Sequence, residues 1–538
     1  MKKSVIVMAK ISVFGLVIST AAHSAPSVTL EVLGTNRTGI FDEGAAEIVA
    51  HDARNQRIFK INADAATVDV LDINDPANPV NMGSIDASAL GGGANSVAIY
   101  KDIVAVAIEA ADKQALGKVA FYDAVDLSLI NHVEVGALPD MVTFTPNGKY
   151  VLVANEGEPN DDYTSDPEGS VSIIDIRHGV NNATVSTADF TAFNDRKDDL
   201  IAQGVRIFGP GASVAQDLEP EYIAVSRNSR IAWAVMQEAN ALAVIDIKNA
   251  RVLKILPLGT KDHSLAGNEL DASNRDDAIN IKNWPVKGFY MPDAIARYNF
   301  FGFPLIVTAN EGDSRDYDGF SEEERIKDLD LDSTAFPDAA TLQEDENLGR
   351  LKTTTANGDT DNDGDFDELY SYGARSFSIW TGNGRLIYDS GSDFERITAR
   401  LIPGNFNSTN DENDSFDNRS DDKGPEPEGI ALGRIKDRMY AFIGLERVGG
   451  IMVYDITNPF NVNFATYYNN RDFSEDVKIN GETNPAVGDL APEGLVFIPA
   501  EKSPNKMPLL VTGNEVSGTT TVFQVNVEHY SSPKWRRY

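Results

Sequence analysis

Three short apolar runs decide the fold of this chain: Leu138-Pro139-Asp140-Met141-Val142, then Tyr150-Val151-Leu152-Val153-Ala154-Asn155-Glu156, then Val171-Ser172-Ile173-Ile174-Asp175-Ile176. An acidic residue after proline opens the first run, a carboxylate closes the second, and an aspartate lies near the end of the third. Short runs rich in Val and Ile, separated by polar turns, are typical of β-strands. This segment therefore predicts a small antiparallel sheet with acids at two strand ends.

The same order of runs and acids recurs along the chain. The next copy is Glu219-Pro220-Glu221-Tyr222, then Trp233-Ala234-Val235-Met236-Gln237-Glu238, then Leu242-Ala243-Val244-Ile245-Asp246-Ile247. The other copies open at Glu47, Asn95, Asp293, Glu428 and Glu493. A β-sandwich has no need to repeat one motif at a fixed phase, and a β-helix has shorter coils. Units of roughly 45 residues instead fit four-stranded blades, so we predict an all-β fold, a seven-bladed β-propeller, over residues 27–528.

Long gaps between the predicted strands indicate insertions in this single domain. They cover residues 160–169, 177–218 and 312–375, and we expect them on one face of the propeller. Long loops inside compact repeats are usually functional or disordered. Residues 529–538 form a predicted tail.

The repeat predicts where the acids lie. Because the first two strands of a blade are antiparallel neighbours, the start of the first and the end of the second share one face. The inner set is then Glu47, Asn95, Asp140, Glu221, Asp293, Glu428 and Glu493, and the outer set is Asp64, Glu109, Glu156, Glu238, Glu311, Glu446 and Glu515. So many like charges disfavour one another's ionisation, which divalent cations would relieve, and Ca²⁺ suits carboxylates best. The alternative is that these acids cap turn amides or pair with arginines.

A second cation site is predicted inside the insertion 312–375. Its acids alternate at Asp359, Asp361, Asp363, Asp365 and Asp367, with Gly364 at the sixth position. Alternating oxygens and a glycine that permits a sharp turn are typical of Ca²⁺ loops. The twelfth position is Tyr370, not Glu, so the loop is a truncated version; the alternative is a solvated acidic loop.

No known nucleophile or nucleotide motif occurs. G-x-S-x-G, the P-loop and the Rossmann glycine pattern are absent from the sequence. Arg37, Arg315 and Arg447 lie in loops near the predicted acidic face and are candidates for anion binding. The alternative for each is an ion pair with a neighbouring acid.

The bulk composition excludes several classes of protein. The formal net charge of −35 argues against nucleic-acid binding, repels anionic lipid and attracts divalent cations. The absence of Cys excludes disulfides, thiol nucleophiles and zinc–thiolate sites. The six His form no short ligand pair, which argues against transition-metal chemistry.

The first 24 residues read as a signal peptide. Lys2 and Lys3 precede an apolar stretch at 11–22, and Ala22-His23-Ser24 carries the small residues read at a cleavage site. We predict cleavage after Ser24 and an exported protein, periplasmic or secreted. No apolar stretch is long enough for a transmembrane helix.

Five motifs resemble the choice-of-anchor I family: Thr38-Gly39-Ile40-Phe41-Asp42-Glu43-Gly44-Ala45-Ala46-Glu47-Ile48-Val49-Ala50, Val70-Leu71-Asp72-Ile73 with Asp75-Pro76, Gly91-Gly92-Gly93-Ala94-Asn95-Ser96-Val97-Ala98, Ala154-Asn155-Glu156-Gly157-Glu158-Pro159 and Pro425-Glu426-Pro427-Glu428-Gly429. The resemblance runs from about Leu30 to Val527. The family is similar to large atypical bacterial alkaline phosphatases and to a mesenchyme-specific cell-surface glycoprotein, which implies export, cell-surface association and a link to calcified material. Many members carry a C-terminal anchor, whereas residues 532–538 here hold no apolar tail.

Two functional hypotheses follow. The first is a calcium-dependent phosphoester hydrolase, for which no catalytic residue is assigned. The second is a non-catalytic calcium-dependent binding protein of a cell surface or mineral. The expected partners are divalent cations and, under the first hypothesis, small phosphoesters.

Overall fold

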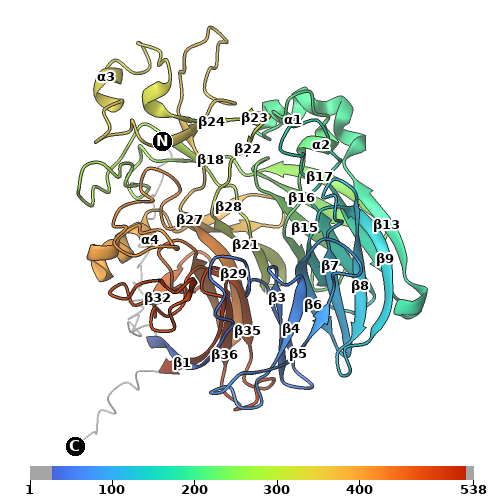
Figure 1. The fold of residues 1–538 in the computed structure, drawn as a ribbon. Helices are drawn as coiled ribbons and strands as arrows, with labels where there is room; N and C mark the ends of the chain where they lie inside the picture. The colour runs from blue at the N-terminus through green and yellow to red at the C-terminus, as the bar shows by residue number, and fades with distance from the viewer. Residues whose placement is uncertain (1–26, 529–538) are drawn as a thin grey trace, which may run out of the picture.

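Seven four-stranded antiparallel sheets build the part of the chain that the computed structural model describes, residues 27–528 (Figure 1). Blades 1 to 3 are β2 (Val49–Asp52), β3 (Arg57–Asn62), β4 (Thr67–Asp72) and β5 (Val80–Asp86); β6 (Ala94–Tyr100), β7 (Ile103–Ile108), β8 (Leu116–Asp123) and β9 (Leu129–Ala137); and β10 (Pro139–Phe144), β11 (Tyr150–Asn155), β12 (Ser170–Asp175) and β13 (Thr184–Asp189). The predicted signal peptide and the tail 529–538 lie outside the described residues.

Blades 4 to 7 follow the same order from the inside outward. They are β14 (Ile223–Val225), β15 (Ile231–Met236), β16 (Ala241–Asp246) and β17 (Arg251–Pro257); β20 (Ile295–Phe300), β21 (Phe303–Asn310), β27 (Ser376–Thr381) and β28 (Leu386–Asp389); β29 (Pro427–Ile435), β30 (Arg438–Leu445), β31 (Ile451–Asp455) and β32 (Asn463–Tyr468); and β35 (Pro492–Ile498), β36 (Leu509–Asn514), β37 (Thr519–Glu528) and β1 (Ser27–Arg37). Each predicted copy of the repeat supplies the first three strands of one blade.

The first strands close into a ring. Each one contacts the first strand of the next blade, in the cycle β2, β6, β10, β14, β20, β29, β35 and back to β2. The blades therefore radiate from a central channel lined by their first strands. The predicted seven-bladed β-propeller is confirmed.

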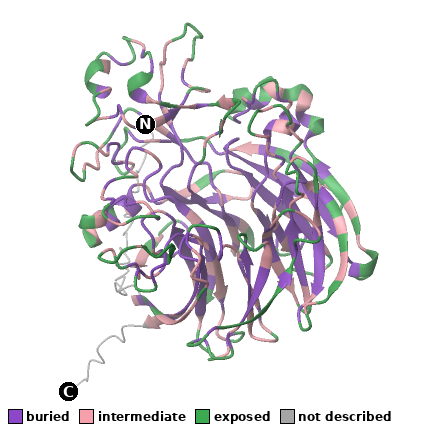
Figure 2. Cartoon of the chain, viewed as in Figure 1, coloured by how far each residue is buried: buried purple, intermediate pink, exposed green. Residues whose placement is uncertain are grey.

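The second and third strands carry the core. They are almost wholly buried (Figure 2). Apolar side chains from both faces of each sheet pack between neighbouring blades. Leu152 and Ile173 of blade 3, for example, share a cluster with Ala234 and Ile245 of blade 4. The outermost strands face solvent on one side, which is why β5 is exposed along most of its length.

The last blade is closed by the start of the chain. Strand β1 pairs with β37 over its whole length, from Ser27 opposite Glu528 to Arg37 opposite Thr519. This pairing joins the two ends of the described chain and completes the ring, and the repeat pattern did not predict it.

The insertions share one face of the propeller, as expected. Loops from second to third strands, and from fourth strands to the next blade, all leave at the same sheet edge. These loops hold η2 (Thr191–Arg196), α1 (Lys197–Gln203), α2 (Val214–Asp217), β18 (Thr260–Asp262), β19 (Lys287–Phe289), β22 (Asp316–Tyr317), β23 (Phe320–Ser321), β24 (Glu323–Arg325), η3 (Ile326–Asp328), α3 (Ala339–Leu342), β25 (Lys352–Thr354), β26 (Tyr370–Ser371), α4 (Asp393–Leu401), η4 (Pro403–Asn405), β33 (Lys478–Ile479) and β34 (Glu482–Thr483). A further short helix, η1 (Val180–Asn182), lies between β12 and β13 at the opposite edge.

The boundaries of the insertions differ from the prediction in two ways. The predicted segment 177–218 contains β13, so the insertion starts only after Asp189. Residues 258–294, 390–426 and 469–491 form further long connections on the same face. Within residues 27–528, no helix has the length and apolar character needed to cross a membrane.

Candidate metal centre

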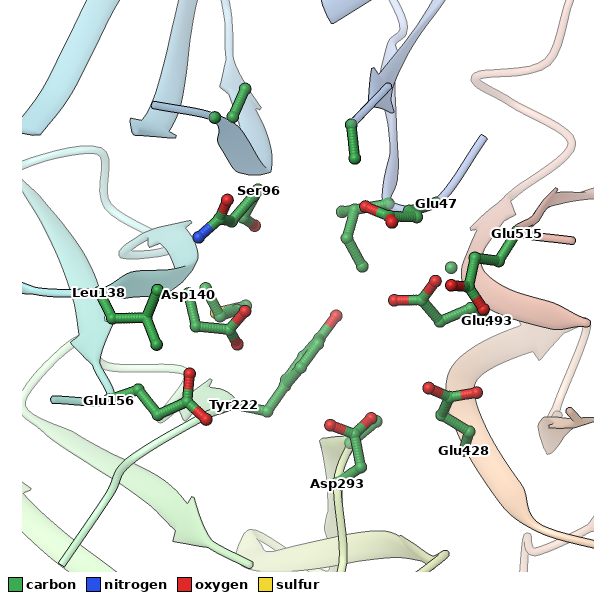
Figure 3. Close-up of a pocket in the computed structure, with 18 of the residues that line it drawn as sticks. Glu47, Ser96, Leu138, Asp140, Glu156, Tyr222, Asp293, Glu428, Glu493 and Glu515 are labelled. Carbon is green, nitrogen blue, oxygen red and sulfur yellow. The ribbon is translucent and has the colours of Figure 1, made fainter. Parts of the chain in front are cut away.

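A cavity of about 520 Å³ opens at the channel mouth, on the face of the insertions. Nine carboxylates and one lysine line it: Glu47, Glu109, Asp140, Glu156, Glu158, Asp293, Glu428, Glu493, Glu515 and Lys113. Figure 3 shows the carboxylates of several blades converging on the same space. The structure thus brings together most of the predicted inner set and three members of the outer set.

A β-bulge presents the inner acid in several blades. The register between the first two strands shifts at Asp140 in blade 3, at Glu428 in blade 6 and at Glu493 in blade 7. A bulge bends the strand and re-aims a side chain. The repeated shift therefore turns these carboxylates into the channel.

A strained residue precedes four of the inner acids by two positions. Its φ is 44° at Leu138, 42° at Met291, 49° at Glu426 and 57° at Ala491, in the left-handed region that non-glycine residues rarely adopt. Repeated strain of this kind is concentrated at functional sites. In three blades its carbonyl accepts the backbone N–H of the outer acid, at 2.9 Å from Glu156 to Leu138, 2.8 Å from Glu446 to Glu426 and 2.8 Å from Glu515 to Ala491. This bond holds the inner and outer acids of one blade together.

Glycine follows the inner acid in blades 6 and 7 because neighbouring first strands touch there. A Cβ on Gly429 would lie 1.7 Å from the carbonyl oxygen of Glu493, and one on Gly494 would lie 2.5 Å from that of Glu47. No side chain fits at such distances. The Pro-Glu-Gly motif thus lets the blades approach closely enough for their acids to meet.

Two blades depart from the pattern. In blade 4 the side chain that lines the cavity is Tyr222, whose phenol points into the centre of the ring (Figure 3). The predicted inner acid Glu221 does not line the cavity and is only 6% exposed. In blade 2 Asn95 lines the cavity and donates to the carbonyl of Pro139 at 3.2 Å.

Burial and mutual repulsion hold these carboxyls partly protonated at neutral pH. Burial, with the charges of Glu515 and Asp140, raises the pKa of Glu47 to about 8. Burial, with Glu158, raises the pKa of Asp140 to about 7. The pKa values of Glu428 and Glu493 lie well above their usual range for the same reasons. Such a ring favours a bound cation, which would let more of the carboxyls ionise.

Buried carboxylate oxygens without a hydrogen-bond donor support this interpretation. Within the described residues, one oxygen of Glu428, which lines the cavity, has no partner, and the same holds for one oxygen each of Glu221 and Glu238, which lie outside the cavity lining. An unpartnered buried oxygen is costly, and hard divalent cations take several such oxygens. The donor set around the channel mouth therefore fits Ca²⁺.

In blades 5 and 6, the chain's own cations pair with acids that lie outside the cavity lining. Carboxylate oxygens of Glu311, Glu426 and Glu446 lie within 4.8 Å of one another. Lys423 approaches Glu311 at 2.8 Å and Glu426 at 3.3 Å, and Arg447 approaches Glu426 at 3.0 Å. Although burial opposes it, these cations hold the pKa of Glu426 well below its usual range. These outer acids are thus matched by ion pairs.

The three candidate anion-binding arginines are placed differently. Arg315 is buried and pairs with Asp217 and, at 2.6 Å, with Glu219. Arg447 is held by Glu426 and Glu446. Arg37 ends β1, is exposed, and donates to the carbonyl of Thr35 at 3.4 Å. Two of the three guanidinium groups are therefore already paired with carboxylates.

The acidic loop of the 312–375 insertion gathers three of its five aspartates. Oxygens of Asp359, Asp361 and Asp367 lie within 4.8 Å of one another. Backbone N–H groups of Asp363 and Gly364 each donate to Asp359 at 3.2 Å, and Gly364 adopts a φ of 102°. Asp363 and Asp365 are not in that group, and the backbone N–H of Asp365 donates to Asp363 at 3.2 Å.

Sequence reasoning missed Tyr222, Glu158, Lys423 and Glu426 as parts of this face. Three of them stand inside or beside quoted motifs: Tyr222 follows Glu221, Glu158 follows Glu156 by two residues, and Glu426 precedes Glu428 by two. Lys423 comes from the 390–426 connection, and no motif signals its contact with Glu311. Asp64, in the predicted outer set, is exposed and does not line the cavity.

Fold and site together define a class: a seven-bladed β-propeller whose channel mouth is lined by carboxylates from nearly every blade. The choice-of-anchor I domain model matches residues 47–459, and the chain belongs to that family.

The chain is 34% identical to Gigasin-3a of Magallana gigas over 194 residues, which is 34% of this chain and 66% of that protein. It is 28% identical to the mesenchyme-specific cell surface glycoprotein of Strongylocentrotus purpuratus over 279 residues, 45% of this chain and 35% of that protein. The matches thus span less than two thirds of either relative.

Two solved structures resemble the chain at low similarity. They are the β-propeller domain of Cps50 (Swd1) from Myceliophteria thermophila, with 9% identity, a TM-score of 0.45 and 93% and 100% of the two chains covered, and the Kuenenia stuttgartiensis hydrazine synthase, with 11% identity, a TM-score of 0.45 and 91% and 98% covered.

Proposed function

We propose that this chain is an exported protein that holds divalent cations, Ca²⁺ above all, at its channel mouth. One observation carries the proposal: nine carboxylates face a cavity of about 520 Å³ with a single lysine among them. The lysine, Lys113, lies 3.8 Å from Glu109 and, among residues 27–528, is the only cation in the cavity lining. Ca²⁺ takes six to eight oxygen ligands in flexible geometry, which suits acids converging from separate blades.

Calcium titration of EDTA-stripped protein by isothermal calorimetry tests this proposal. Glu428→Gln and Glu493→Gln should each weaken binding about tenfold or more, because glutamine keeps the shape but loses the charge. Glu134→Gln is the matched control, since Glu134 is an exposed acid on the outermost strand β9. Absence of binding, or equal binding by all three variants, would refute a metal centre at the mouth.

A phosphoester hydrolase is the more specific function that this site favours. Bound metal ions would polarise a phosphoryl oxygen and activate a water molecule. The chain itself supplies Tyr222, whose phenol stands in the cavity among Asp140, Asp293 and Glu493. Burial, with these charges, raises the pKa of Tyr222 above its usual range, so the phenol remains an O–H donor. We infer that it donates a hydrogen bond to a substrate oxygen.

The alternative is a calcium-dependent binding protein of a cell surface or mineral, without catalysis. It is supported by the similarity to a protein named as a cell surface glycoprotein. Hydrolysis of several phosphomonoesters, with and without Ca²⁺, separates the two functions. Loss of turnover in Tyr222→Phe and Glu428→Gln supports the hydrolase. Intact calcium binding with no hydrolysis leaves the binding protein.

A further inference from the structure

The face opposite the channel mouth carries an exposed aromatic cluster. Phe301 is 87% exposed, Phe303 73% and Phe460 70%. Phe300 lies between them, with ring centroids 4.6 Å from Phe301 and 6.1 Å from Phe460. The cluster joins the β20–β21 hairpin of blade 5 to the loop after β31 in blade 6. Clustered exposed aromatics of this kind mark an interaction surface.

The β20–β21 hairpin has an unfavourable residue, Phe301, in its turn, and this residue exposes its aromatic ring. Phe300 pairs with Phe303, so Phe301-Gly302 is a two-residue turn, with φ of 47° and 87°. Positive φ at both turn positions favours Asn-Gly, and a bulky residue is strained there. Phe301 adopts this strained conformation although most of its ring is exposed to solvent. Packing within the chain does not compensate for that conflict, which therefore points to function.

Basic side chains occupy turns of blades 4 to 6 at the same sheet edge as the cluster. The loops of blades 4 to 6 on this face hold five exposed cations and one acid: Arg227, Arg230, Lys248, Arg385, Lys436 and Asp437. None of the five cations forms a salt bridge within the described residues. The aspartates that end strands here are otherwise engaged, Asp246 with turn amides and Asp455 with Arg438. This face is therefore locally cationic on a chain with a net charge of −35.

We propose that this face docks on an anionic lipid surface, with Phe301, Phe303 and Phe460 entering the interface and the surrounding cations meeting the headgroups. Proteins that bind anionic membranes typically present apolar side chains at loop tips together with nearby basic side chains. The whole-chain charge predicts repulsion from anionic lipid, but the carboxylates of the channel mouth lie at the other edge of the blades, away from the cations in the loops of blades 4 to 6. A six-residue strand such as β16 spans roughly 20 Å, about two Debye lengths at physiological ionic strength.

Flotation with vesicles of 70% phosphatidylcholine and 30% phosphatidylglycerol, in EDTA, tests this proposal. The key variant is Phe301→Asn, which suits the turn better than phenylalanine. It should raise the melting temperature slightly and lower the vesicle-bound fraction severalfold, and Phe303→Ser with Phe460→Ser should abolish binding. Leu116→Ser is the matched control, because Leu116 is 55% exposed at the start of β8 on a different blade.

The charge component is tested separately. Arg230→Glu with Lys436→Glu should weaken binding severalfold, as should 0.5 M NaCl or pure phosphatidylcholine vesicles. Lys254→Glu, on the outer strand β17, should have no effect. Binding that disappears in EDTA but survives Phe301→Asn would overturn the proposal, because the acidic face would then be docking through Ca²⁺. Self-association that is lost with the phenylalanines, without vesicle binding, would instead assign the patch to a second copy of the chain.

Discussion

Raising the pH should destabilise the metal-free protein between about pH 5 and 8, and Ca²⁺ should reverse the effect. The folded-state pKa of Asp140 is about 7 against an ordinary 3.8, and that of Glu47 is about 8 against 4.5. A carboxyl whose pKa is higher in the folded than in the unfolded protein contributes its full stabilisation at pH values below its unfolded-state pKa. That stability is lost as the pH rises through the folded value. The loss therefore falls between about pH 4.5 and 8 for Glu47.

The magnitude follows from the pKa shifts. A shift of about three units corresponds to about 4 kcal/mol. The charge of Asp140 is itself a cause of the Glu47 shift, so the two contributions overlap and about 4 kcal/mol is the estimate for the pair. For a domain of this size, roughly 1 to 2 °C is lost per kcal/mol. The melting temperature of the metal-free protein should thus fall by at least about 5 °C, because the raised pKa values of Glu428 and Glu493 add to the loss.

Thermal unfolding followed by circular dichroism in EDTA, at steps from pH 5 to 8.5, measures this loss. Asp140→Asn and Glu47→Gln should flatten the profile, whereas Glu134→Gln should not. Ca²⁺ should restore stability most at high pH, since the ligands bind as carboxylates. A metal-free melting temperature that stays level or rises over this range would refute the reasoning. The pKa of Glu426 is lowered by folding, so its stabilising effect is lost only as the pH falls below its unfolded-state pKa. Glu426 therefore does not contribute to a change between pH 5 and 8.5.

Three further predictions rest on single features of the chain. If the insertion loop binds Ca²⁺ through the grouped aspartates, Asp361→Asn should reduce the calcium-induced rise in melting temperature and Asp363→Asn should not; equal effects would argue for a merely solvated loop. Gly494→Ala should destabilise the ring by at least about 2 kcal/mol in urea unfolding, because its Cβ would meet backbone at 2.5 Å, whereas Gly404→Ala, with open space around it, should change little. N-terminal sequencing of the exported protein should begin at Ala25 or Pro26, and an intact Met1 would disprove the predicted cleavage.

The sequence predicted those parts of the fold that local patterns encode. The first three strands of every blade are apolar runs with acids at fixed ends, so their number and phase could be read directly. The fourth strands escaped because they are largely exposed, as in β5, and lack an apolar run. The closure of blade 7 by β1 joins residues from opposite ends of the chain, which no local pattern encodes.

The site, like the fold, was predicted from the sequence only where it depends on the repeated strands. The positions of Asp140, Glu428 and Glu493 at the channel follow from strand order alone. Their aim into the cavity depends on a bulge, and in blade 4 Tyr222 lines the cavity instead of Glu221. The cations Lys423 and Arg315 come from long connections whose folding is not repetitive. The sequence offered ion pairing as an alternative for Arg315, but it did not show which acids either cation contacts.

The two faces of the propeller give a final prediction, because they have separate structural origins. The acids stand where first strands begin and second strands end, whereas Phe301 and its basic surround stand on hairpins at the other edge. Within the described residues, no hydrogen bond or salt bridge joins the two sets, so calcium binding and vesicle binding should be independent. Two sites are coupled only if a ligand of one changes the affinity of the other, and the effect is then reciprocal.

We therefore expect Phe301→Asn to leave calcium affinity unchanged and Glu428→Gln to leave vesicle binding in EDTA unchanged. A change of threefold or more in either measurement would show that the blades transmit binding from one face to the other.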